Sequence, residues 1–200
     1  EWSDTQKADA DQKISKHKEA FLKNSETENI LDNGEEPFSI AWDKFYANHN
    51  DKFFKDRHWL FTEFPDLAKE NIRVLEIGCG VGNTVIPLLD KNPSAFVYGC
   101  DYADSAIEIL KNHPSVVDTD SNRCRIWQQD IRQEIPEDII ETGSLDIIVS
   151  IFCLSALHPT QMKPSIEKLL KLLKPGGIIL FRDYGRHDMA QLRFKEKACV

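Results

Sequence analysis

The segment Glu76–Asn83 reads EIGCGVGN and follows Ile72–Ile77, a short apolar run that is typical of a buried strand. Its glycines allow the backbone to turn sharply and to approach a ligand with no Cβ atom in the way. A helix is expected from Asn83 to Leu89, and its first N–H groups suit an anion. The spacing G-x-G-x-G differs from the dinucleotide pattern G-x-G-x-x-G, and no Gly-Lys-Ser/Thr follows as in a P-loop. The stretch therefore predicts a ligand-binding turn between a strand and a helix.

The rest of the chain after residue 71 alternates between apolar runs and longer amphipathic stretches. Strands are expected over residues 95–100, 123–128, 144–151 and 178–181, and helices over residues 104–112 and 159–173. Strands that alternate with helices of about 10–15 residues indicate an α/β fold, with a mostly parallel sheet covered by helices on both faces. Ligands of such sheets bind outside the carboxyl ends of the strands.

Acidic residues end the next two strands at the same edge of the predicted sheet. Asp101 lies 21 residues after Gly80, at a position where a carboxylate can accept hydrogen bonds from both hydroxyls of a ribose. Asp130 and Ile131 follow the third strand, where an acid can accept an adenine amino proton and an apolar side chain can pack on the ring. Together with the glycine turn, these positions favour an adenosine-containing ligand.

Charge and cysteine content narrow the class of protein. The 200 residues include 25 Lys and Arg against 33 Asp and Glu, a net charge of −8, of which −5 falls in residues 1–36. We expect these residues to form an acidic, flexible arm.

Apolar runs reach about eight residues, far short of the roughly 20 that span a bilayer, so no membrane segment is expected. The cysteines show no C-x-x-C spacing, which predicts reduced thiols in an intracellular protein and no metal site: Cys79, Cys100, Cys124, Cys153 and Cys199.

Residues 37–70 hold nine of the nineteen aromatic residues, and we expect a helical cap there. Trp42 and Tyr46 share one helix face, either as core packing or as a cover over the ligand. A short basic cluster stands beside Trp59, and basic residues mixed with aromatics suit phosphate contact and base stacking. The predicted RNA-binding residues are Lys55, Arg57 and His58; the alternative is a solvated helix face.

The glycine turn with Asp101 and Asp130-Ile131 resembles motifs I to III of the class I methyltransferases, which bind S-adenosylmethionine (SAM). The resemblance implies a Rossmann-like fold with SAM as the cofactor over residues 71–200. It also implies a set of cofactor-binding residues, which are Trp42, Tyr46, Glu76, Gly78, Gly80, Asp101, Asp130, Ile131 and Ile151.

Three further segments look like signatures of the tRNA N3-methylcytidine methyltransferases, in the branch similar to methyltransferase-like protein 2. They are FFKDRHW at Phe53–Trp59, LFRDYG at Leu180–Gly185 and DMAQLRF at Asp188–Phe194. The resemblance implies methylation of cytosine 32 in the anticodon loop of threonine and some arginine tRNAs. The family's sheet continues beyond the fifth strand, so we expect this chain to be a fragment or truncated form that lacks the last strands.

Methylation of cytosine N3 leaves the ring cationic, so a nearby carboxylate would stabilise the charge that develops. Asp183, at the end of the fifth strand, is the expected catalytic residue. Tyr184 is expected to bound or stack on a flipped-out base, and Arg182 to hold a phosphate or a base edge. The alternative is that Arg182 and Asp183 form a local ion pair and Tyr184 only packs. The stretch Ser150–Ser155 lacks the N/D-P-P-Y/F motif of many amino-group methyltransferases, which fits a ring nitrogen.

The expected partner is a tRNA anticodon stem-loop, with a helper protein such as an aminoacyl-tRNA synthetase as a further candidate, and the expected location is the cytoplasm. Two other functions stay open. One is SAM-dependent methylation of a protein or small molecule, and the other is a non-catalytic subunit with the same fold. The basic cluster and Arg182–Tyr184 distinguish the tRNA hypothesis from methylation of another substrate, whereas binding of SAM with no turnover on any tRNA would favour the non-catalytic subunit.

Overall fold

The computed structural model describes residues 3–27, 57, 59–117 and 123–185. The chain divides into two compact units, and the larger one, residues 39–183, contains the sheet. The smaller unit includes the helix α1 (Asp4–Thr27). No helix in the described part of the chain is both long and apolar enough to cross a membrane.

Five parallel strands form one sheet in the order β3-β2-β1-β4-β5, so the central strand is the one that precedes the glycine turn. The strands are β1 (Arg73–Ile77), β2 (Phe96–Asp101), β3 (Cys124–Gln128), β4 (Leu145–Ile151) and β5 (Leu173–Arg182). The predicted α/β class with a parallel sheet is confirmed, and the first four strands lie within one residue of their predicted bounds.

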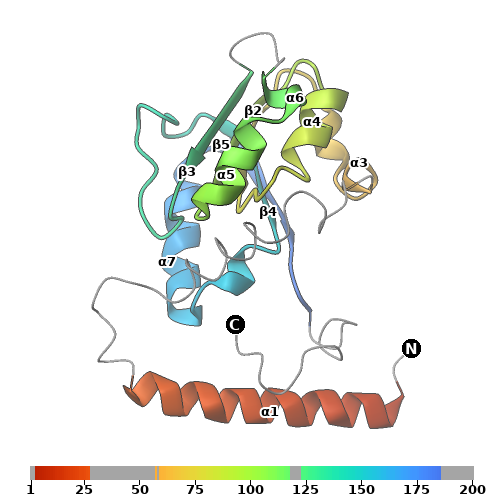
Figure 1. The fold of residues 1–200 in the computed structure, drawn as a ribbon, viewed down its shortest axis with the longest axis vertical. Coiled ribbons are helices and arrows are strands. Elements are labelled where there is room, and N and C mark those ends of the chain that lie inside the picture. Colours follow the sequence, from red (N-terminus) through yellow and green to blue (C-terminus); the bar gives the residue numbers. More distant parts are fainter. Residues whose placement is uncertain (1–2, 28–56, 58, 118–122, 186–200) are drawn as a thin grey trace. The chain divides into compact units, whose positions relative to one another are not determined.

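Helices cover both faces of this sheet (Figure 1). One face packs against α3 (Leu60–Glu63), the 3-10 helix η3 (Pro65–Ala68), α4 (Val85–Lys91) and α5 (Asp104–Lys111). The other face packs against residues 131–140 and the end of α7 (Pro159–Leu170). The short helices α6 (Pro114–Val117) and η4 (Leu154–Ala156) complete the elements.

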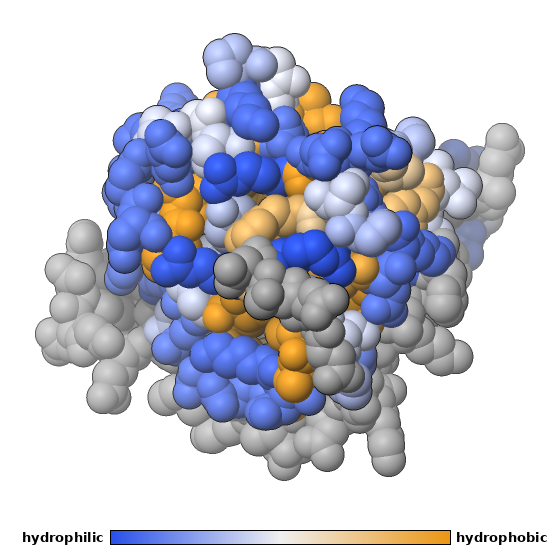
Figure 2. All heavy atoms as spheres, turned by 90° about the horizontal axis from the view of Figure 1, so that it is seen from above, coloured by the Kyte–Doolittle hydropathy of each residue, from blue (hydrophilic) through white to orange (hydrophobic). Residues whose placement is uncertain are grey.

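Side chains alternate between these two layers along each strand. Val74 of β1 lies in the layer with α4 and α5, whereas its neighbour Leu75 lies in the layer with α7, and both are fully buried. Seen from above in Figure 2, hydrophilic residues cover most of the described surface, and hydrophobic ones show only in separate small groups. Most of the large apolar side chains are therefore used inside the two layers.

The structure corrects two predicted bounds. The helix predicted over residues 159–173 ends earlier, and the strand predicted from residue 178 begins earlier. The helix ends at Leu170, because Leu173 already pairs with Leu145 as the first residue of β5. The pairing then passes to Ile147 opposite Ile178, so the residues in between form an irregularity within the strand rather than a turn before it. A side chain at Gly177 would be crowded, because its Cβ atom would lie 3.0–3.1 Å from three backbone oxygens.

Helix α1 lies within residues 1–36, where the sequence predicted an acidic, flexible arm. Its first turn is closed by a reciprocal pair, in which the Ser3 N–H donates to Gln6 Oε1 at 2.8 Å and the Gln6 N–H donates to Ser3 Oγ at 3.3 Å. This capping box satisfies two backbone donors that a helix start otherwise leaves to water. The expectation of a flexible arm over residues 1–36 stays a prediction.

Gly82 provides a test of how the glycine turn packs on the core. Its φ is +95°, and a Cβ atom there would lie 2.3 Å from Cδ1 of the fully buried Leu110. Gly176 has a similar φ of +84° but no atom within 4 Å of the same position. We therefore expect Gly82→Ala to lower the free energy of unfolding by about 1–3 kcal/mol more than Gly176→Ala. Chemical denaturation measures both, and equal losses would contradict the tight packing of Gly82.

Candidate active site

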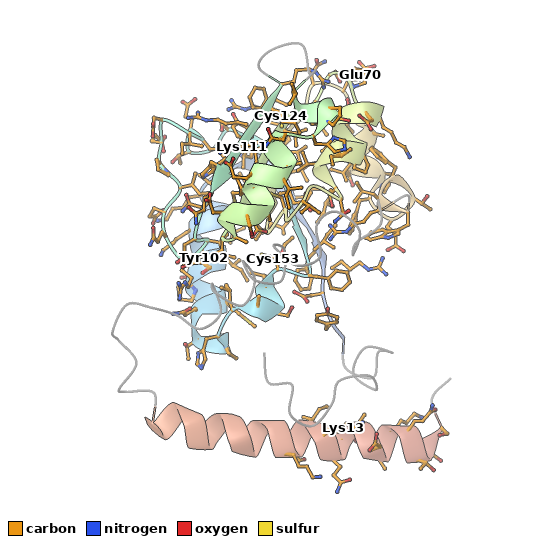
Figure 3. All side chains as sticks on the ribbon, in the orientation of Figure 1. Lys13, Glu70, Tyr102, Lys111, Cys124 and Cys153 are labelled. Carbon is orange, nitrogen blue, oxygen red and sulfur yellow. The ribbon has the colours of Figure 1, made fainter. Side chains whose placement is uncertain are left out.

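The candidate site lies along the carboxyl edge of the sheet, where the turns that follow all five strands come together. Tyr102 and Cys153, which follow β2 and β4, stand at one end of the core in Figure 3, and Glu70 and Cys124, at the amino ends of β1 and β3, stand at the other. Parallel pairing alone produces this separation. It brings to one edge the glycine turn after β1, Asp101, Asp130 and Asp183.

The glycine turn is built from backbone conformations that residues with a Cβ atom rarely adopt. Gly78, Gly80 and Gly82 all have positive φ angles of +63°, +51° and +95°. A Cβ atom at Gly78 would lie 2.6 Å from Cys153 Sγ, so the turns after β1 and β4 are in close contact. The Cys79 N–H also donates to Cys100 O at 3.0 Å, which continues the pairing with β2 into the turn.

Asp101 connects the glycine turn with the start of α5. Its carboxylate accepts the Gly80 N–H at 2.8 Å and the Ala103 N–H at 2.9 Å, and its own carbonyl accepts the Gln129 N–H at 2.8 Å. Carboxylate oxygens accept more than one hydrogen bond each, so these two N–H groups orient Asp101 without by themselves filling its acceptor capacity. A carboxylate held this way at a glycine turn suits the hydroxyls of a ribose.

Glu76 of β1 is buried beneath the turn, with 1% of the residue exposed. The guanidinium Nη1 of Arg57 donates to Glu76 Oε1 at 3.2 Å and to Thr84 Oγ1 at 2.6 Å, and the Arg57 N–H donates to Asn83 O at 3.3 Å. Within the described residues Glu76 Oε2 has no hydrogen-bond partner. Burial raises the pKa of Glu76 from its ordinary 4.5 to about 7, although Arg57 and the Thr84 hydrogen bond lower it.

Arg57 was expected to contact RNA, and the structure gives its guanidinium a different use. The side chain is 15% exposed, and it is directed at Glu76 and Thr84 in the core rather than at solvent. Glu76 in turn was expected to contact the cofactor, and its carboxylate forms an ion pair with Arg57. Nothing in the sequence spacing of 19 residues could have indicated this ion pair.

Asp130 and Ile131 follow β3 as predicted, and they differ in their surroundings. The Asp130 carboxylate accepts hydrogen bonds from Arg132 Nε at 2.9 Å and from Arg132 Nη2 at 2.7 Å, so it forms a bidentate ion pair. Ile131 is 8% exposed and belongs to the apolar layer with α7. Ile151, at the end of β4, is 1% exposed and packs in the opposite layer.

The end of β5 brings Asp183 next to the turn after β4. Asp183 Oδ2 accepts the Ser155 N–H at 2.9 Å, and Tyr184 is 51% exposed. Arg182 contacts Trp59 and Glu63, which precede the sheet in the chain. Its guanidinium lies 4.3 Å from the centre of the Trp59 ring, and its Nη1 lies 3.4 Å from Glu63 Oε2.

Two features of this edge were missed by sequence reasoning. Phe152 has a φ of +55°, which is rare for a bulky residue, and it is 40% exposed where β4 ends. Trp59 and Glu63 are the partners of Arg182. An aromatic residue directly after an apolar strand was the only available signal for Phe152, because a positive φ leaves no trace in the sequence.

Some predicted residues cannot be placed in this site. Trp42, Tyr46, Lys55 and His58 lie outside the described residues, so their roles stay predictions. In the part of the chain that the structure does describe, no group of three or more His, Cys, Asp and Glu side chains has the arrangement of a metal site.

His158 stands at the start of α7, and its side chain caps this helix by accepting the Thr160 N–H.

Comparison with known proteins identifies the family. The family described as "Methyltransferase domain" matches residues 75–179. The tRNA N(3)-cytidine methyltransferase METTL2 of Xenopus tropicalis is 38% identical over an alignment that covers all of this chain and 69% of that protein. The chain belongs to the tRNA N(3)-cytidine methyltransferase family. The family resemblance drawn from the sequence is thereby confirmed.

Other members of the tRNA N(3)-cytidine methyltransferase family match over different lengths. METTL2 of Danio rerio is 41% identical, with 100% of this chain and 65% of that protein aligned. Mettl2 of Drosophila melanogaster is 46% identical, with 80% of this chain and 51% of that protein aligned. The chain thus spans about half to two thirds of the length of these two relatives.

Solved structures agree with the fold of this family member. A methyltransferase in complex with the Trm112 activator of Haloferax volcanii superposes with a TM-score of 0.53 at 24% identity, covering 69% of this chain and 57% of that one. A phosphoethanolamine N-methyltransferase of Haemonchus contortus gives 0.53 at 17% identity, covering 71% and 30%. The expected Rossmann-like class I methyltransferase fold is confirmed.

The buried Glu76 makes stability depend on pH in a direction opposite to that of ordinary carboxylates. Because its folded-state pKa is raised to about 7, the folded state holds a proton that the unfolded state releases near pH 4.5. The stability from this group is complete below pH 4.5 and is lost as the pH rises through 7. Between pH 4.5 and 8 we expect the free energy of unfolding of the wild type to fall by about 3 kcal/mol relative to Glu76→Gln.

Urea denaturation at several pH values measures this difference. The Glu76→Gln variant is the matched control, because an amide fills the same space and does not titrate. A constant difference between the two proteins across this range would contradict the raised pKa.

Proposed function

We propose that the protein is a SAM-dependent tRNA methyltransferase that forms 3-methylcytidine. The observation that carries the proposal is the match to relatives named tRNA N(3)-cytidine methyltransferases, at 33–46% identity for the METTL2 members. The geometry supports it, because the glycine turn and Asp101 stand at the same carboxyl edge of the sheet as Asp183.

The residues present fit SAM. The glycines with positive φ carry no side chains, so a ligand can approach the backbone of the turn closely. The oriented Asp101 carboxylate suits the ribose hydroxyls. Ile131 and Asp130 stand after the next strand, where the adenine would lie, although Asp130 would share its oxygens with Arg132. SAM, when bound, supplies a methyl group on a positively charged sulfur that is open to attack by a lone pair.

Asp183 is proposed to act on the target base. Cytosine N3 carries a free lone pair near neutral pH, so no strong base is needed to create the nucleophile. The ring becomes cationic as the new bond forms, and a fixed carboxylate beside it stabilises that charge. The Ser155 N–H that Asp183 accepts at 2.9 Å keeps the carboxylate in one orientation. Tyr184 is proposed to bound the flipped-out base.

The substrate is proposed to be cytosine 32 in the anticodon loop of threonine and some arginine tRNAs. Lys55 and His58 are proposed RNA contacts. Arg57 is less suited to that role, because its guanidinium is committed to Glu76. A tRNA-binding helper protein is proposed as a partner. The cytoplasm is proposed as the location, which agrees with four free cysteines among the described residues.

Removal of the Asp183 charge separates catalysis from cofactor binding. We expect Asp183→Asn to lower kcat for methyl transfer to tRNA by about 10²–10³-fold, because the developing positive charge loses its carboxylate. The affinity for S-adenosylhomocysteine should stay unchanged. Radiolabelled methyl transfer measures the rate, and isothermal titration calorimetry measures the affinity. The amide retains an oxygen for the Ser155 N–H, so the loop should keep its shape.

Asp101→Asn is the matched variant at the cofactor end of the site. We expect it to weaken S-adenosylhomocysteine binding by about 10–100-fold, since hydrogen bonds to a charged acceptor are replaced by weaker ones. Turnover by Asp183→Asn equal to that of the wild type would overturn the proposed role of Asp183. Unchanged affinity in Asp101→Asn would overturn the ribose contact.

A further inference from the structure

The segment that runs from Arg57 to Glu63, called the 57–63 segment below, contacts both ends of the candidate site. Its described residues are Arg57 and 59–63. Arg57 reaches the glycine turn, whereas Trp59 and Glu63 reach the end of β5. These two places are separated by about 100 residues along the chain, and the segment provides a short connection between them.

The contact at the glycine turn is buried and strong. Arg57 donates to Glu76 before the turn and to Thr84 after it, and its backbone N–H donates to Asn83 O. The two charged side chains are 15% and 2% exposed, so their attraction is little screened by water. Loss of Arg57 would leave the Glu76 carboxylate in the core without its cation, which is costly.

The contact at the end of β5 is more exposed and therefore weaker. The Arg182 side chain is 41% exposed and that of Glu63 is 52% exposed, while the guanidinium covers the Trp59 ring at 4.3 Å. The Arg182 carbonyl accepts the Phe152 N–H at 2.8 Å, and Asp183 follows directly. A shift of Arg182 would thus move the backbone that carries Asp183.

The segment between the two contacts is itself tightly folded. The Leu60 N–H donates to Arg57 O at 2.9 Å, and the Thr62 and Glu63 N–H groups both donate to Trp59 O at 3.0 Å. The Leu60 side chain is fully buried in the core, and Trp59 packs edge-on against Phe64 with ring centres 6.2 Å apart. Backbone hydrogen bonds and core packing therefore hold the segment between its two contacts.

We propose that the 57–63 segment energetically couples the glycine turn to the end of β5, with Arg57, Trp59 and Arg182 as positioning residues. Binding of the adenosine-containing cofactor on the turn and placement of Asp183 at the base then favour one another. This inference rests on the proposed function and extends it. It assigns Arg57 and Arg182 to the coupling of two subsites in place of direct contact with RNA.

Coupling has a consequence that simple structural support lacks. A change at the β5 end must alter cofactor affinity at the turn, because coupling between two sites is reciprocal. A segment that only stabilises the fold would lower the melting temperature and leave the affinity of the folded protein unchanged. Cofactor affinity is therefore the informative quantity.

The test measures S-adenosylhomocysteine affinity of the intact protein by isothermal titration calorimetry. We expect Arg182→Gln to weaken binding about 3–10-fold, a modest loss in keeping with an exposed cation–π contact and ion pair. Lys174→Gln is the matched control. Lys174 lies on the same strand and pairs with Asp146 at 2.9 Å, far from the turn, so its loss should leave affinity unchanged.

The Arg182→Gln substitution is also made in the Arg57→Lys protein, to show whether its effect on affinity depends on Arg57. Arg57→Lys keeps the positive charge beside Glu76, so the protein should fold, but one ammonium group cannot reproduce the geometry of the guanidinium. In this background Arg182→Gln should have a clearly smaller effect on affinity than in the wild type. Additive losses would mean that Arg182 acts by another route and would overturn the inference.

The remaining outcomes are distinguishable from one another. Equal affinity of Arg182→Gln and wild type, or an equal loss in Lys174→Gln, would overturn the coupling and leave the proposed function intact. A wild-type protein that does not bind S-adenosylhomocysteine would overturn the proposed function itself, and the coupling with it.

Discussion

Parallel pairing of β1 with β2 on one side and with β4 on the other fixes the end of the sheet at which the candidate site lies. All five strands then finish at the same edge, and the turns that follow them must meet there. The glycine turn is at the centre of this edge because β1 is the central strand. Asp101 joins that turn to β2 and to the start of α5 through two hydrogen bonds of its carboxylate.

A buried charge is the second constraint, and it connects the core with a segment outside the sheet. Transfer of the Glu76 carboxylate from water into the core costs several kcal/mol, which only a cation and hydrogen bonds can offset. Arg57 and Thr84 offset part of that cost, and burial still raises the pKa of Glu76 to about 7. The position of the 57–63 segment is therefore determined by the electrostatics of the core, and Trp59 and Glu63 are carried to the end of β5 with it.

Much of the fold could be predicted, because apolar runs that end at glycine or aspartate mark buried strands in a parallel sheet. The bounds of β1 to β4 and the position of Asp101 followed from this pattern alone. The start of β5 did not, since its irregular pairing opposite β4 depends on contacts with Leu145 and Ile147 that lie far away in the sequence. The partners of Arg57 and Arg182 could not be predicted either, because a basic residue beside aromatics has the same sequence pattern whether it faces RNA or a buried carboxylate. Tertiary contacts, and not local propensity, decided each of these cases.

Formation of 3-methylcytidine tests the central claim most directly. The protein is incubated with SAM and unmodified tRNA, and the tRNA is then digested to nucleosides for mass spectrometry. Membership in the tRNA N(3)-cytidine methyltransferase family, together with the site at the carboxyl edge, predicts 3-methylcytidine that depends on SAM and on Asp183. Binding of SAM with no methylated nucleoside in any tRNA, even when a helper protein is supplied, would contradict it.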